Sequence, residues 1–157
     1  MRYGRIAFGE KTNMGKIENY INCLASIKMD KLDNQIIEFD DYCILRLKQN
    51  PSSWVYLSEP EMKKEYEREV ERRADNQEIF QKEEDDCCYT IKEKMQTMSG
   101  SELKMMKSYL EERKKLFHEQ LQEAVFGKDD AGELANLAQV RATIAAQNML
   151  RTTCKAK

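Results

Sequence analysis

Residues 58–98 read SEPEMKKEYEREVERRADNQEIFQKEEDDCCYTIKEKMQTM and contain no glycine, and no proline after Pro60. Ser58 and Glu61 have the spacing of a capping box, in which a serine and a glutamate satisfy the first free N–H groups of a helix. Pro60 suits the first helical turn, where a missing N–H costs nothing. Oppositely charged residues at three- and four-residue spacings support a solvated helix. The stretch predicts one charged helix of about 40 residues, roughly 60 Å long.

This long helix has two weak places. Helix propensity falls at residues 74–77 and again at residues 85–86, so a break is expected at one of these positions if the helix is not continuous. The charge of residues 59–98 is also uneven, with 8 basic and 13 acidic residues and a local net charge of −5. The helix is therefore predicted to present an acidic surface.

A second helix is predicted over about residues 101–126. Gly100 interrupts the preceding pattern, and Ser99 with Glu102 offers a second capping box. Apolar residues then recur at three- and four-residue steps, as in a coiled-coil seam, and Arg113 is the only polar residue in that seam.

The C-terminal residues complete an antiparallel helical hairpin. Gly127 ends the preceding helix, and residues 130–133 offer a third capping box for the last one. A link this short makes the two helices antiparallel neighbours. The end of the last helix is expected to fray from Arg151 onward.

The N-terminal third carries two apolar stripes with helical spacing, which predict two shorter helices. We expect the turn between them at residues 28–33, and Pro51 to end the second helix. Residues 1–12 form a short β arm in one interpretation and an extended arm in the other. The apolar positions of the two stripes are Ile17, Ile21, Leu24 and Ile27, and then Leu32, Ile36, Phe39, Cys43 and Leu47.

The chain is therefore predicted to be mainly α, a helical bundle with one long charged helix and a C-terminal antiparallel hairpin. Residues 1–57 would form an N-terminal helical region with an aromatic connector, and residues 58–157 the long helix and the hairpin. At 157 residues the two parts are expected to make one structural unit.

Composition argues against several classes of protein. The chain is 41% apolar and 34% charged with a net charge of −2, so the basic footprint of a nucleic-acid-binding protein is missing. It has no run of about 18 apolar residues, so we do not expect a membrane span. Residues 1–11 lack the apolar core of a secretory signal. An odd number of cysteines, five, then indicates reduced thiols in the cytoplasm.

The sequence also gives no pattern typical of a catalytic centre. The single histidine, His118, has no cysteine at helical spacing. Cys87 and Cys88 are adjacent, which on a helix points them about 100° apart, and nearby acidic residues oppose thiolate formation. Phosphate-binding, dinucleotide-binding and zinc-protease motifs are absent. We therefore predict no enzyme, no catalytic residues, no metal and no cofactor.

A family resemblance appears in the C-terminal hairpin. Residues 116–121, 129–130, 133–139 and 144–150 resemble the tail of small helical proteins from tailed-phage structural gene clusters. Such a tail has two antiparallel helices joined by an acidic turn. The resemblance implies a role in virion assembly or host interaction, with the protein in the host cytoplasm or the virion.

The predicted function is non-enzymatic protein–protein interaction or assembly, with another protein or a second copy of the chain as partner. Large apolar residues isolated among charges are the candidate anchors, because such side chains dominate binding energy at interfaces. The alternative is that they pack inside the chain as core. The candidates are Trp54 and Tyr56 in the connector, and Tyr66, Ile79, Phe80, Ile91 and Met95 on the long helix.

The acidic run of the long helix supports a second hypothesis. Glu83, Glu84, Asp85 and Asp86 are consecutive carboxylates, which could replace the phosphates of a nucleic acid in the basic groove of a partner protein. The protein would then be an acidic inhibitor, and its binding would weaken steeply with salt. The ordinary alternative is a solvated helix face.

Overall fold

The computed structural model describes residues 12–50, 52 and 57–156. The helices among them are α1 (Asn13–Asp33), α2 (Phe39–Gln49), α4 (Glu59–Gln96), α5 (Gly100–Phe126) and α6 (Asp130–Ala156), and these residues contain no β-strand. The predicted mainly α bundle with a long helix and a C-terminal hairpin is confirmed. The predicted N-terminal arm and the aromatic connector with Trp54 and Tyr56 lie outside the described residues.

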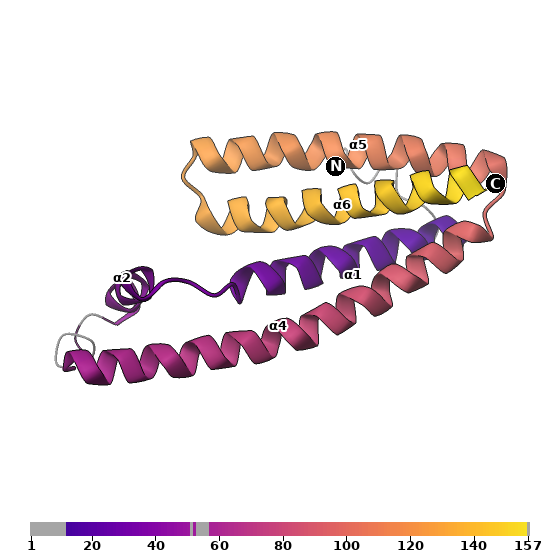
Figure 1. Ribbon diagram of the computed structural model, residues 1–157. Helices are drawn as coiled ribbons and strands as arrows, with labels where there is room; N and C mark the ends of the chain where they lie inside the picture. The colour runs from indigo at the N-terminus through magenta and orange to yellow at the C-terminus, as the bar shows by residue number, and fades with distance from the viewer. Residues whose placement is uncertain (1–11, 51, 53–56, 157) are drawn as a thin grey trace.

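Four of the helices lie side by side in the order α5, α6, α1 and α4 (Figure 1). Helix α6 contacts α5, α1 and α4, and α1 packs against α4. In this order each long helix runs antiparallel to its neighbour, so α5 and α1 point one way and α6 and α4 the other. The N-terminal end of α4 continues beyond the other long helices, and α2 packs beside this extension.

The core lies between α1, α5, α6 and the C-terminal half of α4, with α6 and α1 in the middle. Each long helix contributes the apolar side chains of one stripe, and small residues of α6 allow close approach of the neighbouring helices. Burial of each large side chain stabilises the fold by roughly 1.5–3 kcal/mol. The residues with no exposed surface include Ile17, Ile21, Leu24, Ile91, Met95, Met106, Leu110, Ala142 and Ala146.

The polar residue in the α5 seam, Arg113, is fully buried and hydrogen-bonded. Its Nε donates to Thr143 Oγ1 at 3.0 Å, its Nη1 to the Tyr109 hydroxyl at 3.0 Å, and its Nη2 to Gln139 Oε1. The guanidinium also lies 5.2 Å from the centre of the Phe117 ring. Because a buried charge is costly unless its donors are satisfied, these contacts are what allow arginine in the interface between α5 and α6.

Three predicted boundaries are wrong: α1 and α6 are longer than predicted, and α2 begins only at Phe39, so Leu32 belongs to α1 and Ile36 to the link. Helix α1 continues to Asp33, so residues 28–33 are helical and the link to α2 follows them. The polar residues that suggested a turn face α4, where Lys28 and Lys31 both contact Glu84. Helix α6 continues to Ala156 and does not fray from residue 151, and Thr153 near its end is buried.

Helix α4 is continuous through both of its weak places. At the first, the side-chain amides of Asn76 and Gln77 donate across to α1, to Asn34 Oδ1 at 2.9 Å and to the carbonyl of Lys31 at 2.8 Å. Tertiary contacts therefore compensate for low helix propensity, as is common in folded proteins.

Side-chain caps begin the long helices. The capping box of Ser99 and Glu102 is complete, since each side chain accepts from the backbone N–H of the other residue. Ser58 accepts from the N–H of Glu61, but its hydroxyl donates to the Glu61 carboxylate. The cap of α6 is Asp129 and not Asp130, because Asp129 Oδ1 accepts from the N–H of Gly132 at 3.0 Å. The helix therefore begins at Asp130, one residue earlier than predicted.

Candidate interaction surface

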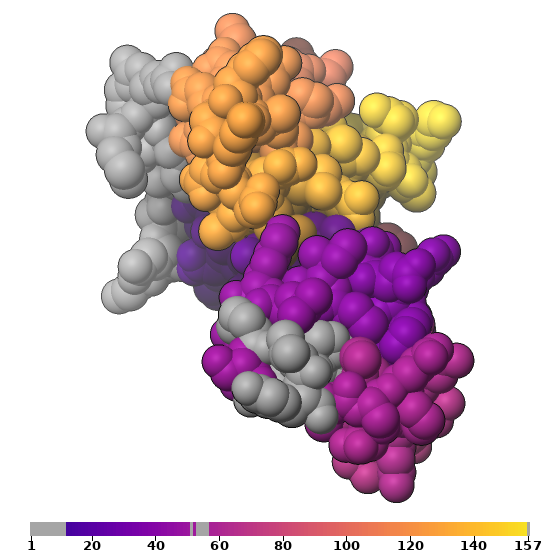
Figure 2. Space-filling model, turned by 90° about the vertical axis from the view of Figure 1, so that its left-hand side faces the viewer, coloured from indigo at the N-terminus to yellow at the C-terminus, as the bar shows by residue number. Residues whose placement is uncertain are grey.

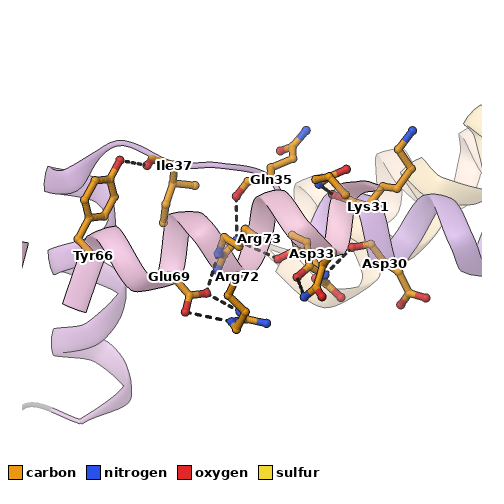
Figure 3. A network of polar contacts seen from close by, with 12 residues as sticks. Asp30, Lys31, Asp33, Gln35, Ile37, Tyr66, Glu69, Arg72 and Arg73 are labelled. Atoms are coloured by element: carbon orange, nitrogen blue, oxygen red, sulfur yellow. Dashed lines mark hydrogen bonds and ion pairs between the residues drawn. The ribbon is translucent and has the colours of Figure 1, made fainter. Parts of the chain in front are cut away.

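The link between α1 and α2 is held on α4 by a set of polar contacts (Figure 3). Arg73 Nη1 donates to the carbonyls of Asp33 at 3.0 Å and Gln35 at 2.8 Å. The Tyr66 hydroxyl donates to the carbonyl of Ile37 at 2.6 Å. The last carbonyls of a helix and those of the following link need partners, and α4 supplies them from its side chains. The link is therefore fixed where a free connection would be expected to move.

Arg73 is itself oriented by a carboxylate on its own helix. Its Nε donates to Glu69 Oε1 at 2.8 Å, and Arg72 forms two hydrogen bonds with the same carboxylate. The hydrogen bond from Arg72 lowers the pKa of Glu69, and the hydrogen bond from Arg73 adds to this effect. Glu69 is thus held in its charged form, which keeps Arg73 aimed at the link.

Helix α2 sits on α4 through an aromatic cluster. The Tyr66 ring lies 5.4 Å from the Phe39 ring in an edge-to-face arrangement and 5.5 Å from the Tyr42 ring. Tyr42 is the buried residue of α2, and burial raises its pKa. Arg46 adds an ion pair with Glu65 at 3.5 Å. Tyr66, a predicted partner anchor, therefore has its contacts inside the chain.

The opposite face of α2 is exposed and partly apolar. Ile44 has 53% and Leu47 has 41% of its surface accessible, and Ile36 in the preceding link is exposed as well. The predicted stripe is thus wrong for Ile36 and Leu47, which do not face the core. Charged residues flank the apolar ones, with Asp40 and Asp41 in the first turn of α2 and Arg46 and Lys48 in the last.

The turn of the α5–α6 hairpin lies at the same end of the molecule. Figure 2 views this end directly, with the turn above α2 and the start of α4 below it. Two exposed apolar residues precede the turn, Val125 and Phe126, and Phe126 has 86% of its surface accessible. We call the exposed residues Ile36, Ile44, Leu47, Val125 and Phe126, together with the charged residues of α2, the α2 end face.

The predicted partner anchors on the middle of α4 differ in burial: some lie in the core and one is exposed. Ile91 and Met95 are fully buried in the core of their own chain, so their prediction as partner anchors is wrong. Phe80 is partly buried, and Ile79 is exposed at 55% of its surface. Trp54 and Tyr56 lie outside the described residues.

The acidic run is divided too. Glu84 is turned toward α1, where its two oxygens lie 3.3 Å from Lys28 Nζ and 3.1 Å from Lys31 Nζ. Glu83, Asp85 and Asp86 are exposed. The continuous row of carboxylates in the sequence is therefore interrupted on the surface, because its second member is neutralised by α1.

The cysteines and the histidine are not arranged as a reactive group. Burial raises the pKa of Cys87 to about 11, and its Sγ donates to the carbonyl of Tyr20 at 3.3 Å. Burial also raises the pKa of Cys88. His118 is exposed on α5. In the described part of the chain, no group of His, Cys, Asp and Glu side chains could hold a metal ion.

Comparisons with known proteins add no relative. Neither protein-family models, nor curated proteins, nor solved structures gave a match to this chain. Within the described ranges, every helix is too short or too polar to span a bilayer.

Three apolar residues of the α2 end face are not predicted from the sequence. Ile44 lies beside the stripe that was assigned to the core, and Val125 and Phe126 precede the glycine that ends α5. The exposure of Phe126 could have been predicted from the sequence, because a large aromatic residue next to a helix-ending glycine faces the turn and not the seam. That of Ile44 could not, since its exposure depends on which face of α2 contacts Tyr66.

Proposed function

We propose that the protein is a non-enzymatic interaction or assembly protein that associates with a second copy of itself through the α2 end face. The observation that carries this proposal is a fixed helix with an exposed apolar face. Polar contacts and an aromatic cluster hold α2 in place, yet Ile44 and Leu47 remain accessible to solvent. Ordering this surface for a partner needs little further loss of entropy, which favours association.

The charge pattern of α2 favours a second copy over an unrelated partner. Asp40, Ile44 and Lys48 follow one another at four-residue steps, so they share one face of the helix. If two α2 helices pair antiparallel about a two-fold axis through Ile44, Asp40 of each copy lies opposite Lys48 of the other. A two-fold interface needs a surface complementary to itself, and this face meets that condition.

The expected dimer is weak and depends on concentration. Helix α2 has 11 residues, so it covers less area than the roughly 1,200–2,000 Å² that a stable interface buries. Val125 and Phe126 at the same end enlarge the apolar area available to the partner. The resemblance of the hairpin to small helical proteins of tailed-phage structural gene clusters supports a role in assembly or host interaction.

Sedimentation velocity over a concentration series tests the proposal. The wild-type chain should shift from monomer to dimer with rising concentration. Ile44→Ser should move this shift to higher concentration, whereas Ile79→Ser is the matched control, because Ile79 is equally exposed but lies on α4. Equal effects of the two substitutions, or a wild-type monomer throughout, would contradict the proposal.

The charges provide a second test. Asp40→Lys should weaken the dimer by placing lysine opposite Lys48, and Asp40→Lys combined with Lys48→Asp should restore it. Restoration by the double substitution is specific to an antiparallel α2 pair. If the double variant is as weak as the single one, the dimer does not use this pairing.

A further inference from the structure

A small cavity lies where α1 meets α4 and α6. Its volume is about 150 Å³, enough for several water molecules. Three of its six lining residues are cationic and none is acidic, and the others are two glutamines and a leucine. The lining residues are Lys28, Lys31, Leu32 and Gln35 on or next to α1, Gln77 on α4, and Arg141 on α6.

The cations around this cavity exceed the charge that neutralises them. Lys28 and Lys31 share one carboxylate, since each is paired with a different oxygen of Glu84. Within the described residues, Arg141 has no ion pair and no hydrogen bond from its side chain. Three cations therefore line the cavity, and one carboxylate, that of Glu84, forms ion pairs with two of them.

The donors are also more numerous than their acceptors. Each lysine ammonium has three donor hydrogens and an arginine guanidinium has five. Lys31 uses hydrogen bonds to Gln81 at 2.7 Å and Glu84 at 3.1 Å. Arg141 keeps its planar set of donors, which matches the oxygens of a phosphate group in bidentate geometry.

We propose that this cavity binds a phosphate-class oxyanion, with Lys28, Lys31 and Arg141 as its cationic ligands. Three cations suit a phosphate group, which carries about −1.5 to −2 at neutral pH. A phosphate has enough oxygen acceptors to accept from α1 and α6 at once, so binding would join the two helices. The site is independent of the α2 end face.

Isothermal titration with sodium phosphate, at constant ionic strength kept with sodium chloride, measures this binding directly. Arg141→Gln should weaken it roughly tenfold or more, as expected for the loss of hydrogen bonds from a charged group. Arg151→Gln is the matched control, since it removes the same charge from the same helix outside the cavity. Both arginines are exposed, and a melting curve for each variant checks that it is folded.

The control also separates a built site from general attraction between charges. Equal weakening by Arg141→Gln and Arg151→Gln would overturn the proposal, as would the absence of binding to the wild-type chain. Phosphoserine in place of inorganic phosphate distinguishes the two sources of the group. Phosphoserine binding that Arg141→Gln weakens assigns the cavity to a modified peptide, and phosphate binding without phosphoserine binding assigns it to the free ion.

Discussion

Two isoleucines of α4 allow a direct comparison between core and surface. Ile91 has no exposed surface and belongs to the buried cluster with Ile17 and Ile21, whereas Ile79 is 55% exposed. Ile91→Ala removes buried carbon and leaves a cavity between packed helices, which costs about 2–5 kcal/mol. Ile79→Ala should change the stability by no more than about 0.5 kcal/mol, because an exposed side chain loses little and alanine favours helix.

Thermal and urea denaturation followed by circular dichroism measure the difference. For a domain of this length, 1 kcal/mol shifts Tm by about 2–4 °C, so Ile91→Ala should lower Tm by about 4–20 °C. Ile79→Ala should leave Tm within about 2 °C of the wild type. If the two substitutions destabilise equally, the assignment of α4 faces is wrong. If Ile91→Ala leaves stability unchanged, the core described for the C-terminal half of α4 is wrong.

Three further predictions concern single side chains. Ser99→Ala should cost about 1 kcal/mol by removing the cap of α5, while Ser108→Ala in the same helix should be neutral in the same urea titration. The hydrogen bond from Arg72, and next that from Arg73, lowers the pKa of Glu69 below its ordinary value of 4.5. The charged Glu69 carboxylate therefore contributes its full stabilisation at neutral pH. This stabilisation is lost as the pH falls below about 4.5 through the lowered pKa, so Glu69→Gln should flatten this part of the stability profile in melts at graded pH. Iodoacetamide at mildly alkaline pH should label exposed Cys23 well before Cys87, whose pKa of about 11 keeps it a thiol, and equal labelling rates by mass spectrometry would refute this.

Helix type and order could be predicted from the sequence because they depend on local signals. The capping box at Ser99, the absence of glycine from α4 and the short link after Gly127 each act within a few residues. The end of α1 could not be predicted in this way. Lys28 and Lys31 look like turn residues until Glu84 of α4 is placed beside them, and that contact joins distant parts of the sequence.

The candidate site depended even more on tertiary contacts. The hydrogen bonds of Arg73 and Tyr66 to carbonyls of the α1–α2 link have no sequence signature, since every residue has a carbonyl. These contacts decide which face of α2 is covered and leave Ile44 exposed. For the same reason the isolation of Ile91 among charges in the sequence gave no warning that the fold buries it.

The central position of α6 also has a consequence for synthesis. Helix α6 follows the other described helices in the chain and contacts α5, α1 and α4. At ~5–20 residues per second, the ribosome needs on the order of ten seconds after finishing α1 to reach α6. During that time Ile17, Ile21 and Leu24 lack one of the helices that cover them in the native state. The nascent chain is therefore expected to be a chaperone substrate through α1, and to fold only after α6 has left the exit tunnel.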